Sequence, residues 1–318
     1  VKGAGLYKLH VPTGKVVPLL EDTEGTIRDP AVHYDGKTIL FSWRKGNAKS
    51  FHLYTIQSDG TGLTQLTSGN YDDIEPAWLP DGGIIFVSSR SRRWVNCWFT
   101  QVATVHRCDA DGINIKPLST NLEQDNTPWP LPDGRLLYTR WEYIDRGQLD
   151  YHHLWTMNPD GTNHAIYYGN MHPGGLYIDA KPIPGTNEVL TINSPLHGKR
   201  EHEGYIALVS AKKGPDDLSA MRNIAEGIFT DPYPITKDLF MAAQRQSIVF
   251  IHRDGKVEYL HELTNKEHPR RIHEPRPLVA RPREWVIPPR TNYAKTTGRL
   301  VLADARVGRN LEGIKAGE

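Results

Sequence analysis

The sequence predicts an all-β fold, a six-bladed β-propeller in which each blade is a four-stranded antiparallel sheet. A unit of about 50 residues recurs along the chain, and its first three copies each carry two Asp-Gly pairs between strand-like segments. The 318 residues accommodate roughly six such units. Each end of the chain resembles half a unit, so the two ends together supply the last one. Four-stranded sheets repeated at this period are typical of a propeller.

The Asp-Gly pairs predict the hairpins inside each blade. Glycine accepts a positive φ and aspartate tolerates it, so the pair suits a tight turn between two alternating strands. The first pair of each unit is expected to join the inner strands: Asp35-Gly36, Asp81-Gly82 and Asp133-Gly134. The second is expected to join the outer strands: Asp59-Gly60, Asp111-Gly112 and Asp160-Gly161.

A polar residue followed by proline recurs along the chain. We interpret this dipeptide as the start of the inner strand, because proline lacks a hydrogen-bond donor and fits a position where the ladder has not begun. The copies are Asp29-Pro30, Glu75-Pro76, Thr127-Pro128 and Asp231-Pro232.

These signals place five blades in order along the chain, at residues 29–69, 72–119, 125–168, 176–227 and 231–263. The fourth blade is irregular, since Pro184-Gly185 replaces the first Asp-Gly pair and a loop-rich insertion follows at 194–205. Residues 218–229 are expected to form a short helix or a loop between blades.

The ends of the chain predict the sixth blade. Residues 5–20 resemble two outer strands with no inner strands before them, and residues 285–307 resemble inner strands with no outer pair after them. We expect 275–307 and 5–20 to join. This closure would remove the exposed edges of an open sheet and make residues 1–318 one domain.

Composition narrows the class of protein. The net charge is +1 with acidic and basic residues interspersed, so no basic surface for nucleic acid is expected. No apolar run approaches the length that spans a bilayer. The chain begins with Val1, which favours a processed product or an excised segment from which any export signal has been removed.

The first candidate site is a ring of polar residues. A propeller brings its inner strands around one axis, so the polar residues near their starts would surround one mouth of the central channel. Such a ring could hold a metal ion, a sugar or a cofactor. It could equally cap loops and tie neighbouring blades together. The residues are Arg28, Asp29, Asp73, Glu75, Asp125, Asn126, His172 and Asp231.

Histidine supplies the second candidate site. Neutral imidazole is a common metal ligand, and His152 together with His153, His172, His197 and His202 falls within about 50 residues, mostly on loops. The metal-site hypothesis assigns zinc or manganese to His153, His172, His197 and His202. Their spacing fits no zinc motif such as HExxH, so solvated loop histidines are the alternative.

Cys97 is a fifth candidate ligand. It lies in a long connection of the second blade, near Trp94, Trp98 and the pair Arg92-Arg93. A thiolate beside arginines has a lowered pKa and can bind a soft metal. Cys108 is expected to face the core, and the two cysteines could pair or stay free. No Cys-x-x-Cys-His motif is present, so the chain cannot attach a c-type haem by itself.

Longer segments resemble known families. The run LYTIQSDGTGLTQLT (53–67) looks like the WD40-like repeats of TolB-type propellers. A closer resemblance is carried by NTPWPLPDGRLLYTRWEY (126–143), HHLWTMNPDGTN (152–163) and GRLVLADARVGRNLEGIKAGE (298–318). These segments resemble the middle propeller domain of the hydrazine synthase alpha subunit and its relatives, over most of residues 29–318.

That resemblance implies an exported, periplasmic or extracellular, multi-domain protein whose propeller is flanked by domains carrying c-type haem. The chain would then be a scaffold or docking module for a haem-bearing domain or subunit. In the family a cysteine outside the haem region helps to hold a zinc ion, and Cys97 is the candidate for that position. The haem-bearing region itself is missing from this sequence.

A metal-dependent enzyme with its site in the central channel is the alternative hypothesis. A zinc or manganese ion on the histidines named above would act with Arg140 or Arg200, which could neutralise the carboxylate of a uronate. The resemblance here is to oligogalacturonate lyases, which share the TolB-like propeller and act on an acidic saccharide. The sequence leaves open whether this chain is an enzyme.

Overall fold

The chain divides into two compact units, Val1–Pro288 and Pro289–Glu318. The computed structural model describes residues 3–195, 197, 200, 202–263, 271–292, 294–302, 304, 307, 313 and 315. Within these residues all strands lie in the first unit, and the helical segments are three single turns of 3-10 helix, so the fold is almost entirely β. No helix in the described part of the chain is long and apolar enough to cross a membrane.

The strands follow one another in antiparallel hairpins. The first ten are β1 (Ala4–His10), β2 (Lys15–Asp22), β3 (Thr26–Val32), β4 (Thr38–Arg44), β5 (His52–Gln57), β6 (Thr64–Gln65), β7 (Asp73–Trp78), β8 (Ile84–Ser88), β9 (Thr104–Cys108) and β10 (Lys116–Pro117). The next eight are β11 (Asp125–Pro130), β12 (Leu136–Trp141), β13 (His152–Met157), β14 (Ala165–Tyr168), β15 (Leu176–Pro182), β16 (Glu188–Ser194), β17 (Gly204–Ser210) and β18 (Met221–Pro234). The last three are β19 (Leu239–Gln244), β20 (Ser247–His252) and β21 (Val257–Glu262). The 3-10 turns are η1 (Ser89–Ser91), η2 (Ala211–Lys213) and η3 (Leu218–Ala220).

The strands group into repeated sheets. β1 and β2 form a two-stranded sheet, β3–β6 and β7–β10 form four-stranded sheets, and β11–β21 form one continuous sheet. In that continuous sheet a single parallel bridge joins β13 to β15, and the long strand β18 pairs first with β17 and then with β19. It therefore consists of three four-stranded groups: β11–β14, β15–β18 and β18–β21.

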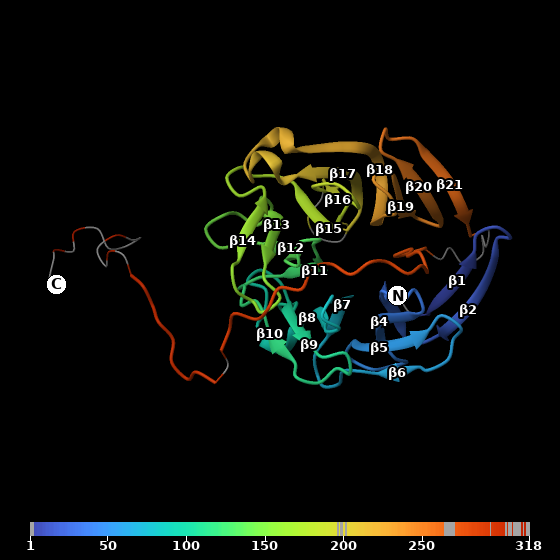
Figure 1. Cartoon of the computed structure of the whole chain (residues 1–318), viewed down its shortest axis with the longest axis horizontal. Coiled ribbons are helices and arrows are strands. Elements are labelled where there is room, and N and C mark those ends of the chain that lie inside the picture. The colour runs from blue at the N-terminus through green and yellow to red at the C-terminus, as the bar shows by residue number, and fades with distance from the viewer. Residues whose placement is uncertain are drawn as a thin grey trace. The chain divides into compact units, whose positions relative to one another are not determined.

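The sheets stand around a common centre. Figure 1 shows β7, β11 and β15 toward that centre and β6, β10 and β14 at the periphery. Apolar clusters fill the space between consecutive sheets; one joins β8 and β9 to β12 and β13 through Ile85, Val87, Val105, Leu136 and Met157. Equivalent clusters lie between the other consecutive sheets. Consecutive sheets from β3 to β21 thus pack face to face through apolar side chains, as expected of a propeller.

The Asp-Gly pairs lie in turns between paired strands, as predicted. Their glycines also allow close contact between units. A Cβ atom on Gly161 would lie 2.7 Å from the carbonyl oxygen of Leu118, which follows the outermost strand of the preceding sheet. Gly112 meets Leu66 and Gly255 meets Ile224 in the same way. These three outer turns therefore lie directly against the backbone of the sheet before them.

The polar-proline dipeptides lie inside the inner strands rather than at their starts, which corrects the sequence interpretation. β3 begins three residues before Asp29, and its register with β4 shifts between Arg28 and Ala31. The same shift recurs in β7, β11, β15 and β18. Each shift is a β-bulge, where residues leave the ladder and the missing proline donor removes no hydrogen bond.

The C-terminal part of the first unit crosses the middle of the fold. This strap (residues 274–288) is the orange-red segment at the centre of Figure 1. The Arg281 amide donates to the Tyr34 carbonyl (3.1 Å) and the Trp285 amide to the Pro132 carbonyl (3.2 Å). A guanidinium nitrogen of Arg283 donates to the Pro80 carbonyl (3.0 Å). The strap therefore touches the inner turns of three consecutive sheets.

Two sequence expectations are wrong in the described residues. The segment 218–229 is mainly strand, because the single turn η3 is followed at once by the part of β18 that pairs with β17. The inner strands expected within 285–307 are absent from its described residues; 293, 303, 305 and 306 lie outside them. Trp285 lies against an inner turn instead of pairing in a strand, because its amide donates to the Pro132 carbonyl (3.2 Å).

Candidate functional site

A polar residue at the same place in each repeat has the left-handed backbone conformation. These residues have φ values between 47° and 63°: Asp29, Glu75, Thr127, Asp179, Asp231 and Glu274. The first five occupy the bulges of the inner strands, and Glu274 begins the strap. Non-glycine residues rarely adopt this conformation, so a compensating interaction is expected at each position.

Hydrogen bonds join the first four of these positions in order. Asp29 Oδ2 accepts from the Glu75 amide (2.8 Å), and Glu75 Oε2 accepts from the Thr127 amide (2.6 Å). Thr127 Oγ1 accepts from the Asp179 amide (3.0 Å). The left-handed conformation thus aims each side chain at the backbone of the following sheet.

The strap continues this series. Asp231 Oδ2 accepts from the Glu274 amide (3.0 Å), and the Glu274 side chain is hydrogen-bonded to Asp29, where the series began. The Asp179 side chain differs from the others because it binds within its own strand, where its Oδ1 accepts from Lys181 Nζ (2.6 Å). We call Asp29, Glu75, Thr127, Asp179, Asp231 and Glu274 the polar ring.

The charges within the polar ring determine where its protons lie. Burial raises the pKa of Glu274, and the carboxylates of Asp29 and Asp231 raise it further. Burial acts the same way on Asp29, but the charge of Arg28 and the bond with Glu274 outweigh it, so the pKa of Asp29 is lowered. Glu274 therefore carries the proton and donates to Asp29. Arg28 binds both Asp29 (2.7 Å) and Glu75 (3.3 Å).

The predicted channel-mouth residues outside the polar ring lie in different places. Asn126 contacts Glu75 (3.5 Å). Asp73 and Asp125 begin β7 and β11 and bind arginines instead, Arg90 at 2.8 Å and Arg140 at 3.0 Å. Those two acids tie adjacent strands of their own sheets.

The sequence did not single out Asp179 and Glu274 of the polar ring, nor Lys181, which binds Asp179. Alanine follows Asp179, so the proline signal is missing there. Glu274-Pro275 does carry the signal, 43 residues after Asp231-Pro232 by subtraction, and could have been found.

The candidate histidines fall into separate groups. His152 stacks on Trp141 with ring centroids 5.1 Å apart, and His197 lies 4.8 Å from His152. Burial and the nearby His197 lower the pKa of His152 to about 3. These rings form an aromatic cluster in which His152 is neutral.

His153 and His172 form a second pair, with ring centroids 6.2 Å apart. His153 Nε2 lies 3.1 Å from the Gly174 carbonyl, and burial, only partly offset by that contact, lowers its pKa to about 4. His202 lies elsewhere, near Glu75; burial raises the pKa of that carboxyl, and the charges of Arg28 and, to a smaller extent, His202 only partly offset the rise. Among the described residues no group of three or more His, Cys, Asp or Glu side chains could hold a metal ion.

The two arginines of the enzyme hypothesis are engaged in ion pairs. Arg140 binds the buried Asp125, and Arg200 Nη2 lies 3.0 Å from Glu203. Both guanidinium groups therefore already have a carboxylate partner within the chain.

Both cysteines are free. Cys108 is buried on β9, and burial raises the pKa of its thiol to about 12. Cys97 is exposed in the connection 89–103, where its Sγ accepts from Gln148 Nε2 (3.2 Å).

The long connections share one side of the sheets, which we call the loop face. It carries the connections 45–51, 89–103 and 142–151, because each joins the second strand of a sheet to the third. The Asp-Gly turns occupy the opposite ends of these strands, the turn face. The loop face therefore has the irregular segments on which binding residues are usually found.

Comparison with known proteins supports the fold. No protein-family model matches the sequence, and no curated protein matches it either. A solved structure of hydrazine synthase from Kuenenia stuttgartiensis is similar with a TM-score of 0.79 at 16% identity, over 90% of this chain and 44% of that one. This chain thus spans less than half of that structure's length.

Two TolB structures are also similar. A putative TolB from Agrobacterium tumefaciens has a TM-score of 0.59 at 15% identity, over 82% of this chain and 89% of that one. TolB from Acinetobacter baumannii has a TM-score of 0.58 at 15% identity, over 81% of this chain and 65% of that one. Identities this low establish the fold alone. The chain therefore has a TolB-like β-propeller fold.

Proposed function

We propose that this chain is a propeller module that docks a haem-bearing protein domain on its loop face. The observation that carries the proposal is a cluster of exposed aromatic side chains in the connection 89–103. Trp94 is 58% exposed, Trp98 71% and Phe99 94%. Tryptophan and phenylalanine are enriched in the buried centres of protein interfaces, so their exposure on one loop marks a contact surface.

Neighbouring connections extend this surface. The connection 142–151 contributes exposed Ile144 and Leu149, and it is tied to 89–103 by the bond from Gln148 to Cys97. Exposed Leu122 lies in the connection 118–124, which Arg93 reaches through the Thr120 carbonyl (3.3 Å). We call Trp94, Trp98, Phe99, Leu122, Ile144 and Leu149 the loop-face patch.

Charge and similarity suggest the partner's nature. Arg92 and Arg93 flank the loop-face patch, so a partner with an acidic rim would be complementary. The similar hydrazine synthase chain continues well beyond the region that matches, which is consistent with a propeller that serves adjoining domains. An exported location, as the sequence resemblance implies, would place the module where c-type haem proteins occur.

We further infer that the propeller has six sectors closed into a ring. The strap segment 274–280 would occupy the inner place of the sixth sector, and β1 with β2 its outer place. Support comes from Leu278, Leu6 and Leu20, which all pack against the apolar cluster on β4 and β5. Gly60 faces the Leu19 carbonyl (3.7 Å for an added Cβ), as the other outer turns face the sheet before them.

A photo-crosslinking experiment tests the docking proposal. The residue p-benzoylphenylalanine is placed at Trp98 or, as control, at Ile113, an exposed side chain beside an outer turn on the turn face. Both variants are produced in the natural host and irradiated. Crosslinking from position 98 to a polypeptide with a haem spectrum, and none from position 113, is the expected result.

The purified partner then allows a quantitative test. Trp98→Ser is expected to weaken binding about 30-fold, because truncating a central tryptophan typically costs about 2 kcal/mol or more. Ile113→Ser should leave the affinity unchanged. Equal affinities for both variants, or equal crosslinking from both positions, would overturn the loop-face assignment.

A further inference from the structure

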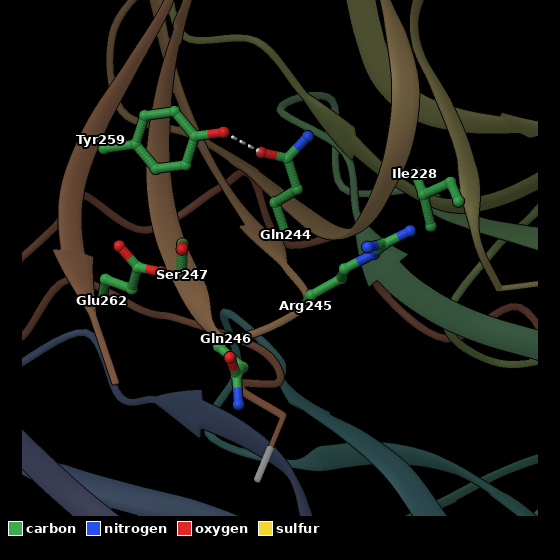
Figure 2. A pocket seen from close by; sticks show the side chains of 7 residues that line it. All are labelled: Ile228, Gln244, Arg245, Gln246, Ser247, Tyr259 and Glu262. Atoms are coloured by element: carbon green, nitrogen blue, oxygen red, sulfur yellow. Dashed lines mark hydrogen bonds between the residues drawn. The ribbon is translucent and has the colours of Figure 1, made fainter. Parts of the chain in front are cut away.

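A polar hollow of about 400 Å³ lies beside the tip of the β19–β20 hairpin. Figure 2 shows its lining, with the side chain of Arg245 extending toward Ile228 on one side and Glu262 lying on the other. Gln244, Gln246, Ser247 and Tyr259 complete the lining. The volume falls within the range of about 300–1,000 Å³ that is usual for small-molecule sites.

Arg245 has an unusual place in this hairpin. Gln244 pairs with Ser247, so Arg245 and Gln246 form a two-residue turn. Arg245 has a φ of 56°, a conformation that glycine or asparagine adopts at lower cost. A strained backbone position of this kind is often found where a side chain has a binding role.

The guanidinium of Arg245 is free to bind a ligand. Among the described residues its side chain has no hydrogen-bond or ion-pair partner, whereas the backbone is held by the Ile272 amide, which donates to the Arg245 carbonyl (2.8 Å). A planar guanidinium with unused donors binds a carboxylate in a two-pronged manner.

The rest of the lining suits hydroxyl groups. Tyr259 donates its phenol proton to Gln244 Oε1 (3.0 Å), which leaves the Gln244 amide nitrogen to donate. The Glu262 carboxylate can accept from ligand hydroxyls, and Gln246 and Ser247 can both donate and accept. An inorganic anion would use only Arg245, whereas a hydroxylated anion would use both sides of the hollow.

We propose that this hollow binds a small hydroxylated carboxylate of the sugar-acid class, with Arg245 holding the carboxylate and Glu262 a hydroxyl. The site is distinct from the loop-face patch, and it does not depend on the docking function. The ligand could be a free sugar acid or the end of an acidic saccharide chain, since both present the same groups.

Titration calorimetry with chosen probes tests the proposal. The full chain is titrated with glucuronate, with a galacturonate trimer and with glucose, which has similar hydroxyls but no carboxylate. Saturable binding of glucuronate, weakened by added salt, identifies a free sugar acid; binding of the trimer alone identifies a chain end. Glucose is expected to bind at least about tenfold more weakly than the acid.

Two variants locate the binding. Arg245→Asn keeps a residue that tolerates the turn conformation but removes the cation, so it should fold and lose about tenfold or more in affinity. Arg222→Gln removes an exposed guanidinium of β18 outside the hollow and should bind as the parent does. The proposal is overturned if neither acidic probe binds, if glucose binds equally well, or if both variants weaken binding alike.

Discussion

At the residue scale, single side chains join consecutive sheets. Asp29 illustrates the principle: its left-handed backbone directs the carboxylate to the Glu75 amide in the next sheet. A non-glycine residue in this conformation costs of order 1–3 kcal/mol, and a hydrogen bond from a backbone amide to a carboxylate contributes a similar amount. The free energy of the hydrogen bond therefore offsets the backbone strain at each such position, and the side chain connects two consecutive sheets.

Glu274→Gln should remove a pH dependence of stability. The pKa of Glu274 is raised in the fold above its ordinary value of about 4.3, so its contribution is complete below that pH and decreases as pH rises through the folded value. Glutamine can donate to Asp29 at every pH. Urea unfolding at about pH 5 and pH 8 should show the variant gaining stability relative to the parent as pH rises.

The control for this test is Glu226→Gln, which changes an exposed glutamate of β18. Its stability should follow the parent's at each pH. Parallel pH profiles for the parent and Glu274→Gln would show that Glu274 does not hold the proton.

The two cysteines should differ sharply in reactivity. Cys97 is exposed, whereas Cys108 is 1% exposed and its thiol pKa is raised to about 12. An aromatic disulfide that reacts with free thiols at neutral pH should therefore detect one thiol in the native protein and two after denaturation. Detection of no thiol in the denatured, unreduced protein would reveal a disulfide and contradict the structure.

The sequence identified the connectors at Asp29, Glu75 and Asp231 but gave their geometry wrongly. Proline after each acid suggested the first residue of a strand, whereas the structure has a bulge within the strand. Both places tolerate a residue without an amide proton, so the sequence pattern could not separate them. The role of each carboxylate depends on an amide about 50 residues away, which local patterns cannot show.

At the element scale, the strap backbone packs closely against glycines of the inner turns. A Cβ atom on Gly36 would lie 2.5 Å from the Ala280 amide nitrogen, and one on Gly134 would meet the Trp285 carbonyl. Gly82 occupies the same place in the intervening sheet and has nothing within 4 Å. At Gly82 glycine is therefore needed only for the turn conformation. At Gly36 and Gly134 it also leaves room for the strap backbone.

Alanine substitutions separate these two roles. All three glycines have positive φ, so alanine at any of them should cost about 1 kcal/mol through backbone strain. Gly36→Ala and Gly134→Ala should cost about 1–3 kcal/mol more than Gly82→Ala, because the added carbon overlaps the strap backbone. Free energies of unfolding in urea provide the comparison, and equal losses at the three sites would mean that the strap does not rest there.

Sequence patterns predicted the hairpins well and the irregular elements poorly. Alternation and Asp-Gly pairs are local signals, and the hairpins they predict are present from β3 to β14. The strap has no such signal: its course is set by contacts of Arg281 and Arg283 with inner turns far away in the sequence. The first part of β18 was taken for a connection between blades, because this one long strand belongs to two four-stranded groups.

At the scale of the whole molecule, packing between consecutive sheets accounts for the architecture. Each apolar cluster joins two sheets, and the outer turn glycines let each sheet approach the one before it. Length and repeat period predicted this arrangement because both are global properties of the sequence. The loop-face patch and the Arg245 hollow were not predicted, since exposure and concavity arise only once the loops meet in space.

The proposed closure of the six sectors into a ring can be measured at Glu274, which lies between Asp231 and Asp29 in the polar ring. Amide hydrogen exchange by NMR reports whether the Glu274 amide is bonded to Asp231 and held against Asp29, as the Glu75 and Thr127 amides are held in the continuous part of the ring. We expect the Glu274 amide to be protected within about tenfold of those two amides, and to lose its protection together with theirs on unfolding. Exchange of Glu274 at the rate of an unstructured chain, while Glu75 and Thr127 stay protected, would contradict it.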